Sequence, residues 1–218
     1  MSLAVSSLTL MRSGRMIVSD LSFALTPGRA TLLRGPNGVG KSTVLRAIAG
    51  LMPIASGSVV LNGTPLTDRD AFQDQVLFAG HQDALKPTLT VAENIAFWAH
   101  LFGGDVRAAM QSFQLDEIAD RPAHACSAGQ KRRTGLARLA LAKDRPLWLL
   151  DEPTVSLDQA TVERVASVIR AHCDAGGMAL IATHIDLGLT DADTLTLTRP
   201  RPVTAAEETD PFMAGGWE

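Results

Sequence analysis

The sequence predicts an α/β fold with a mostly parallel sheet, an N-terminal antiparallel β subdomain and an inserted helical subdomain. Short apolar runs separated by turns fill the first thirty residues, and their period-two spacing is typical of antiparallel strands. Strand and helix patterns alternate later in the chain, which indicates parallel strands covered on both faces. The length of 218 residues is suited to one domain, which we expect over residues 1–218. Because residues 86–143 have helical character between two strand regions, we expect a helical subdomain to be inserted there.

Local patterns of apolar and turn residues justify each element. Short apolar runs beside turn residues predict strands at 8–10, 16–18, 21–25, 30–33, 58–61, 75–79, 147–150 and 178–183. Helical periodicity and end signals predict helices at 43–49, 91–102, 106–113 and 158–173. The clearest start signal is the N-cap Thr90, whose capping box is completed by Glu93. Residues 199–218 begin with closely spaced prolines and continue into an acidic stretch, which predicts a surface tail.

The most specific pattern is G-x-x-x-x-G-K-[ST], which lies between an expected strand and an expected helix, as this phosphate-binding motif requires. Its glycines allow backbone N–H groups to curl around phosphates, and the helix N-terminus adds partial positive charge. We expect Lys41 to reach the β- and γ-phosphates and the Ser42 hydroxyl to bind Mg²⁺. A glycine-rich turn ahead of a helix is the alternative without a ligand. The predicted nucleotide-binding residues are Gly35, Pro36, Asn37, Gly38, Val39, Gly40, Lys41, Ser42 and Thr43.

Two carboxylates follow the apolar strand at 147–150, at the strand end where α/β sheets bind their ligands. Asp151 is suited to hold the Mg²⁺ of Mg·ATP, and Glu152 lies one residue farther out, where it could orient and polarise the attacking water. A strand that ends in acidic residues for structural reasons alone is the alternative.

Composition narrows the function classes. The net charge of −3, with acidic and basic residues interspersed, argues against nucleic-acid binding. The N-terminus shows no basic segment followed by an apolar one, so no export signal is expected. The long uncharged run at 47–67 is rich in turn residues, which does not fit a membrane span. The two cysteines form no C-x-x-C pair and suggest a reducing compartment, so we expect a cytoplasmic protein.

The order of these motifs resembles that of the nucleotide-binding subunits of ATP-binding cassette (ABC) transporters. In that family a phosphate loop, a glutamine loop, an L-S-G-G-Q signature, an acidic strand, an S-x-L-D loop and a switch histidine follow one another. The matching positions, within a resemblance over residues 3–198, are Gly35–Ser42, Gln82, Cys126–Gln130, Leu147–Glu152, Ser156–Asp158 and His184.

The resemblance implies that two subunits pack head to tail and share two ATP molecules. Each ATP would lie between Lys41 and its neighbours in one chain and Ser127 and Gly129 in the other, and Gln82 would sense the γ-phosphate and Mg²⁺. The implied roles are catalysis for Glu152, His184 and Gln82, Mg²⁺ binding for Ser42, Gln82 and Asp151, signature contacts across the dimer for Ser127, Ala128, Gly129 and Gln130, and a D-loop contact for Asp158.

The chain departs from the family pattern at the signature and at the base. Cys126 replaces the leading leucine and Ala128 replaces the first glycine, and we interpret Cys126 as an apolar filler. The position at which relatives stack an aromatic ring on adenine falls near Arg12, whose guanidinium plane could stack on a base, and GTP use stays open. We interpret the basic run 131–133 as a solvated helix face, and Phe97 and Trp98 as core residues.

Residues 80–98 and 127–133, together with the short overall length, are similar to the CcmA-type ATPases of cytochrome c maturation. This resemblance implies integral-membrane permease subunits as partners, a peripheral location on the cytoplasmic side of the inner membrane, and ATP hydrolysis coupled to haem export or to release of a haem-loaded chaperone. One alternative is the ATPase of another ABC exporter, for a drug, lipid or peptide. Others are a soluble cassette protein that acts on DNA or ribosomes, and a binding module that does not hydrolyse ATP.

Overall fold

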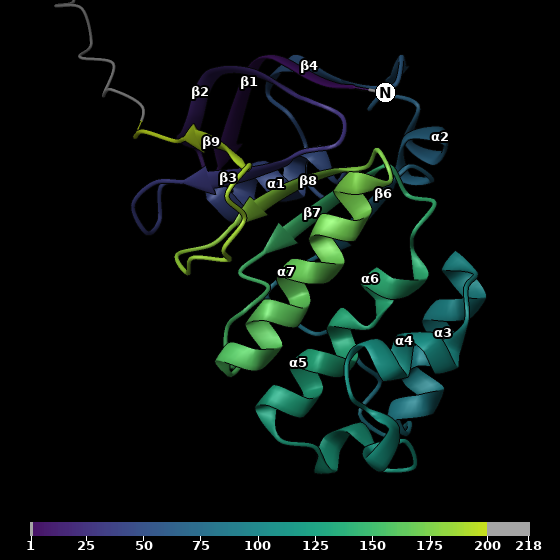
Figure 1. Cartoon of the computed structure of the whole chain (residues 1–218). Coiled ribbons are helices and arrows are strands. Elements are labelled where there is room, and N and C mark those ends of the chain that lie inside the picture. Colours follow the sequence, from purple (N-terminus) through teal and green to yellow (C-terminus); the bar gives the residue numbers. More distant parts are fainter. Residues whose placement is uncertain (1, 200–218) are drawn as a thin grey trace, which may run out of the picture.

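The computed structural model describes residues 2–199, and it contains two sheets of opposite character (Figure 1). The four-stranded antiparallel sheet has the order β2-β1-β4-β5, and the five-stranded parallel sheet has the order β6-β7-β8-β3-β9. The strands are β1 (Leu3–Arg12), β2 (Arg15–Leu25), β3 (Ala30–Arg34), β4 (Ser56–Leu61), β5 (Thr64–Pro65), β6 (Val76–Ala79), β7 (Leu147–Asp151), β8 (Met178–Ala182) and β9 (Asp193–Thr196). The predicted tail, apart from Arg199, lies outside the described residues.

The helices cover the parallel sheet and fill the segment between β6 and β7. They are α1 (Lys41–Ile48), α2 (Arg69–Gln73), α3 (Val91–Phe102), α4 (Val106–Ser112), α5 (Ala128–Leu136), α6 (Arg138–Leu141) and α7 (Gln159–Asp174), with short 3₁₀ turns at Asp116–Ile118 and Ala123–Ala125. Figure 1 shows the antiparallel sheet and the α3–α6 segment at opposite ends of the molecule. The predicted fold class, including the antiparallel subdomain and the helical insertion, is therefore confirmed.

The parallel sheet separates two hydrophobic clusters, and successive side chains of β7 contribute to one cluster and then to the other. Trp148 and Leu150 belong to the cluster under α7 and the helical segment, whereas Leu147 and Leu149 belong to the cluster with α1 and the antiparallel sheet. Successive side chains of a strand point to opposite faces, so a central strand must be apolar throughout to serve both clusters. This requirement explains why the residues of β7 that precede Asp151 are all apolar and buried.

The order of the strands brings three separate chain segments to one edge. β8 pairs in parallel with both β3 and β7, so the carboxyl ends of these three strands lie side by side. The phosphate loop follows β3, Asp151 ends β7, and Thr183 and His184 follow β8. The ligand crevice of an α/β sheet lies at this edge.

The helical segment begins as its sequence predicts. The Thr90 hydroxyl accepts a hydrogen bond from the Glu93 N–H at 3.2 Å, and the Glu93 carboxylate accepts one from the Thr90 N–H at 2.8 Å. Ile95 is fully buried, but Phe97 is 38% exposed, so the interpretation of Phe97 as a core residue is wrong. It lies two positions after Ile95, a spacing that turns its side chain away from the face that packs inward.

Outside residues 86–143, for which helical character was expected as a whole, three of the described elements were not predicted from the sequence. β9 has the polar sequence Asp-Thr-Leu-Thr, which carries no apolar run because the strand lies at the edge of the sheet. The helix α2 is five residues long and the strand β5 two residues long, which is too short for a periodic signal. The N-terminal strands are longer than expected because irregularities in their pairing interrupt the alternation.

A buried histidine supports the strand that carries the acidic residues. The His172 ring stacks on Trp148 of β7, with 3.8 Å between ring centroids and an interplanar angle of 4°. Its Nε2 lies 3.3 Å from the Met178 carbonyl oxygen, and burial lowers the pKa of His172 to about 4.

We predict that the free energy of unfolding falls as the pH drops from about 6.5 toward about 4. In this range the unfolded chain takes up a proton on His172, whose ordinary pKa is about 6.5, and the folded chain does not. Urea unfolding at several pH values measures the effect, and His172→Gln should reduce the pH dependence while exposed His100→Gln leaves it unchanged. Equal pH dependence in His172→Gln and the wild type would contradict this account.

Candidate nucleotide-binding site

The phosphate loop curls tightly between β3 and α1. A side chain at Gly35, where φ is 140°, would approach the Leu197 carbonyl oxygen to 2.6 Å, so the loop requires glycine there. Lys41 is 8% exposed, and its Nζ donates to the carbonyl oxygens of Gly35 at 2.8 Å and Pro36 at 3.2 Å. The backbone of the loop therefore holds the Lys41 ammonium group beside the N-terminus of α1.

An open cleft of about 290 Å³ joins this loop to two other parts of the chain. Its lining residues are Arg12, Ile17, Asn37, Gly38, Gly40, Lys41, Ser42, Thr43, Glu152 and His184. The remaining predicted loop residues have supporting positions, since Val39 is buried in the core and Pro36 accepts the Lys41 hydrogen bond. The antiparallel hairpin supplies Arg12 and Ile17, so this cleft spans both sheets.

Two of the predicted metal ligands, one of which lines the cleft, contact each other. The Ser42 Oγ donates to Asp151 Oδ1 at 2.8 Å, and Asp151 is only 2% exposed. Among the described residues no salt bridge compensates the Asp151 carboxylate, and a buried carboxylate is costly without a cation. A hydroxyl and a carboxylate oxygen are ligands that Mg²⁺ prefers, so this pair fits a magnesium ion beside the phosphate loop.

Two of the three predicted catalytic side chains also lie close together. Glu152 Oε1 lies 3.5 Å from His184 Nε2, and both residues line the cleft. The Glu152 backbone has a φ of 48°, in the left-handed region that non-glycine residues rarely adopt. Its N–H donates to the Ala182 carbonyl oxygen at 2.8 Å, which ties the residue after β7 to the end of β8.

Gln82 does not join these residues. It is exposed and lines a hollow with Asp83, Leu85 and Lys131, which is separate from the cleft that Ser42 lines. Two of the three predicted magnesium ligands are therefore together in this conformation, and the third is not.

The signature residues form a surface of their own at the start of α5. Ser127 is the N-cap, with its hydroxyl accepting from the Gln130 N–H at 3.3 Å and its own N–H donating to the Gln130 side chain at 2.9 Å. Ser127 and Ala128 are exposed, and Gly129 lies beside the Ser156 carbonyl. Asp158 caps α7 by accepting from the Thr161 N–H at 2.8 Å, and its hydrogen bonds to Thr161 lower the pKa of Asp158. None of the signature residues lines the cleft of the same chain.

The interpretation of residues 131–133 as a solvated basic face is wrong. Arg132 is 4% exposed, and its guanidinium donates to the chain segments at Gly80–Asp83 and Asp151–Pro153. Arg133 donates to the carbonyl oxygens of Phe113 and Gln114. Helical spacing carried a signal for Arg132, because it lies one turn before the buried Leu136 and on the same face of α5.

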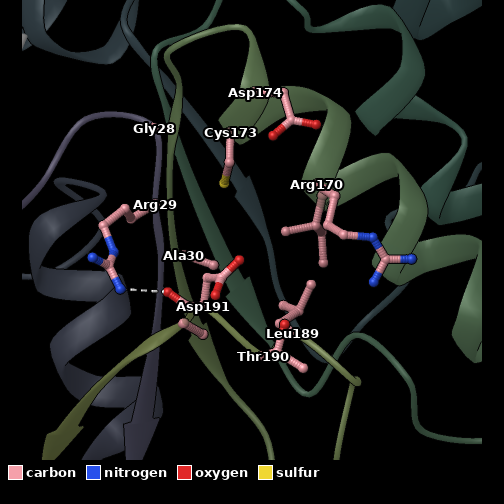
Figure 2. Close-up of a pocket in the computed structure, with 11 residues that line it drawn as sticks. Gly28, Arg29, Ala30, Arg170, Cys173, Asp174, Leu189, Thr190 and Asp191 are labelled. Atoms are coloured by element: carbon pink, nitrogen blue, oxygen red, sulfur yellow. Dashed lines mark hydrogen bonds between the residues drawn. The ribbon is translucent and has the colours of Figure 1, made fainter.

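A second hollow, of about 120 Å³, lies at the other end of the parallel sheet, where β3 begins and α7 ends (Figure 2). The Arg29 Nη2 donates to the Asp191 carbonyl oxygen at 2.7 Å and pairs with Asp193 at 3.2 Å. These contacts bind the turn before β9 to the start of β3. None of the predicted site residues lines this hollow. We interpret it as a structural feature that forms where the edge strand β9 is attached to the sheet.

Comparison with known proteins gives one consistent result. A family model described as ABC transporter matches residues 18–155. The chain is 51% identical over 208 residues to the cytochrome c biogenesis ATP-binding export protein CcmA of Ruegeria pomeroyi, which covers 93% of this chain and 96% of the relative.

Solved structures show the same fold. The structure of an ATP-binding subunit of an ABC transporter matches with a TM-score of 0.80 at 24% identity, covering 90% of this chain and 86% of that one. A dimeric ATP-binding cassette in a post-hydrolysis state, bound to ADP and phosphate, matches with a TM-score of 0.76 at 22% identity, covering 90% and 97% of the two chains. Within residues 2–199, no helix combines the length and apolar character needed to cross a bilayer.

We predict that Asp151→Asn loses most of the dependence of nucleotide binding on Mg²⁺. The substitution keeps an acceptor for the Ser42 hydroxyl but removes the charge that a magnesium ion requires. Titration of a fluorescent ATP analogue with and without Mg²⁺ measures this dependence, and Asp193→Asn, at the distant Arg29 ion pair, is the control. Unchanged magnesium dependence in Asp151→Asn would remove Asp151 from the metal site.

Proposed function

Because this chain belongs to the ABC transporter family, and within it to the family of cytochrome c biogenesis ATP-binding export proteins, we propose that it is the ATP-hydrolysing subunit of a cytochrome c maturation transporter. The observation that carries the catalytic part is a pair of contacts made by residues that line one cleft, Ser42 with the buried Asp151 and Glu152 with His184. The identity to curated relatives over nearly the whole chain supports the cytochrome c part.

The mechanism follows from the positions of these side chains. Lys41 and the loop N–H groups bind the β- and γ-phosphates of ATP and orient the terminal phosphoryl group. Magnesium, when held by Ser42 and Asp151, supplies positive charge that offsets the charge on these phosphates. Glu152 orients the attacking water and accepts its proton, since it lines the cleft beside the loop. His184, next to Glu152, stabilises the negative charge that spreads over the phosphoryl oxygens.

Each chain supplies half of two sites in this proposal. The exposed Ser127 hydroxyl and the α5 N-terminus are suited to contact a γ-phosphate, but they lie outside the cleft of their own chain. A head-to-tail homodimer would place this surface over the partner's phosphate loop. ATP would then close the dimer through contacts that disappear on hydrolysis. In the closed state Gln82 would move toward the magnesium ion, and Asp158 would lie near the dimer contact.

The relatives are named cytochrome c biogenesis ATP-binding export proteins, which supports a role in export. For that role we propose integral-membrane permease subunits of the cytochrome c maturation system as partners of this chain. The chain would then be peripheral on the cytoplasmic side of the inner membrane, where ATP is available. Its cargo would be haem, or its energy would release a haem-loaded chaperone. An ATPase for another exported drug, lipid or peptide is the alternative, because it would use the same catalytic residues.

Arg12 lines the cleft on the hairpin side, where the base would lie. We propose that its guanidinium plane and Ile17 contact the purine, in place of the aromatic ring expected in the family. Such a contact recognises the ring system and leaves ATP and GTP weakly distinguished.

We predict that Glu152→Gln retains ATP binding and loses hydrolysis by about two orders of magnitude or more, as expected for a group that positions water and accepts its proton. Phosphate release by the purified full chain measures turnover, and a fluorescent ATP analogue measures binding. Undiminished turnover would remove Glu152 from this role.

The pathway is tested by haem staining of membrane c-type cytochromes in a host that lacks this protein. We expect the wild-type chain to restore the cytochromes and Glu152→Gln to fail, at equal protein levels. Normal cytochromes in the host without the chain would overturn the cytochrome c assignment and favour another ABC exporter.

A further inference from the structure

The buried guanidinium of Arg132 contacts two segments that both belong to the proposed catalytic machinery. Its Nε and Nη2 donate to the carbonyl oxygens that follow and end β7, with Pro153 at 3.1 Å, Glu152 at 2.7 Å and Asp151 at 3.4 Å. Arg132 lies on α5, just after the signature residues. One side chain of the signature helix therefore holds the backbone of the proposed catalytic glutamate.

The remaining nitrogen contacts the segment that contains Gln82. The Arg132 Nη1 donates to the carbonyl oxygens of Gly80 at 3.1 Å and His81 at 3.3 Å, and to Asp83 Oδ1 at 2.9 Å. The Arg132 side chain is 5% exposed and that of Asp83 is 26% exposed, so this ion pair is largely shielded from solvent. All three guanidinium nitrogens are thus used, and they join the glutamine loop to the end of β7.

The chain is shaped to allow this arrangement. A side chain at Gly135, one turn after Arg132, would approach the Asp83 carbonyl oxygen to 2.8 Å and its Cα to 3.1 Å. The absence of a side chain at Gly135 lets the glutamine loop lie directly on α5. Glu152, at the other end of the guanidinium, has a left-handed backbone with a φ of 48°, a conformation that surrounding contacts must maintain.

We propose that Arg132 is a positioning residue that makes the glutamine loop and the Glu152 backbone move as one unit. Arg132 does not line the nucleotide cleft, so its effect on hydrolysis would pass through the residues that it holds. A displacement of the loop at Asp83 is passed through the guanidinium to the carbonyl group of Glu152, which shifts the carboxylate relative to His184. The inference rests on the proposed ATP hydrolysis at this site.

The planar shape of the Arg132 guanidinium, as well as its charge, is needed to connect the two segments. A lysine ammonium donates from a single nitrogen and cannot reach the acceptors that lie around the three nitrogens of the planar guanidinium. We therefore expect Arg132→Lys to retain the positive charge but to lose the connection between the two segments.

The first experiment separates positioning from binding. We expect Arg132→Lys and Arg132→Gln to lower kcat for ATP hydrolysis about tenfold or more and to change the KM for ATP less than about threefold, since small misplacements of a catalytic group are costly. The matched control is Arg145→Gln, which removes an arginine that also bonds an aspartate and a carbonyl, Asp74 and Gln73, away from the site. A kcat for Arg132→Lys within twofold of the wild type would overturn the proposal.

The second experiment tests the connection independently of hydrolysis. Hydrogen–deuterium exchange on the full chain should show that Asp83→Asn speeds exchange at the amides of Glu152, Thr154 and Val155 as well as in its own loop, and that Arg145→Gln affects neither segment. Faster exchange confined to the loop would overturn the connection. If Asp83→Asn speeds exchange in both segments but the wild-type chain hydrolyses no ATP, the proposed function is contradicted and the connection through Arg132 stands.

Discussion

The parallel pairing of β8 with both β3 and β7 is the constraint on which the rest of the site depends. It places the phosphate loop, Asp151 and His184 at one edge although these residues are far apart in the chain. The pairing requires strands that are apolar on both faces, and the two hydrophobic clusters on either side of the sheet meet that requirement. The short distance between Ser42 and Asp151 is a consequence of this strand order.

Residues predicted from motifs and from strand ends were located well by the sequence. Phosphate-loop residues, Glu152 and His184 meet in one cleft because the position of each follows from a strand end, which an apolar run marks clearly. Arg12 was placed by its distance from the loop lysine in related chains, and the hairpin does bring it to the cleft.

Contacts between elements that are distant in the chain were less predictable. The three adjacent basic residues Lys131, Arg132 and Arg133 differ in burial because α5 turns only Arg132 toward two loops. The acceptors for its guanidinium are mostly backbone carbonyl oxygens, which carry no signal in the amino-acid sequence. Phe97 and the edge strand β9 were missed for a related reason, since exposure depends on what packs against an element as well as on its composition.

At Glu152 the left-handed backbone makes the stability of the fold and the rate of ATP hydrolysis favour different residues. A glycine would adopt this conformation without the steric penalty, which is about 1–2 kcal/mol for a residue that carries a Cβ atom. Selection for robustness alone would therefore favour glycine here, and selection for turnover would retain the carboxylate. A directed-evolution experiment that rewards only heat resistance should inactivate the protein at this residue early, while the cleft around it stays intact.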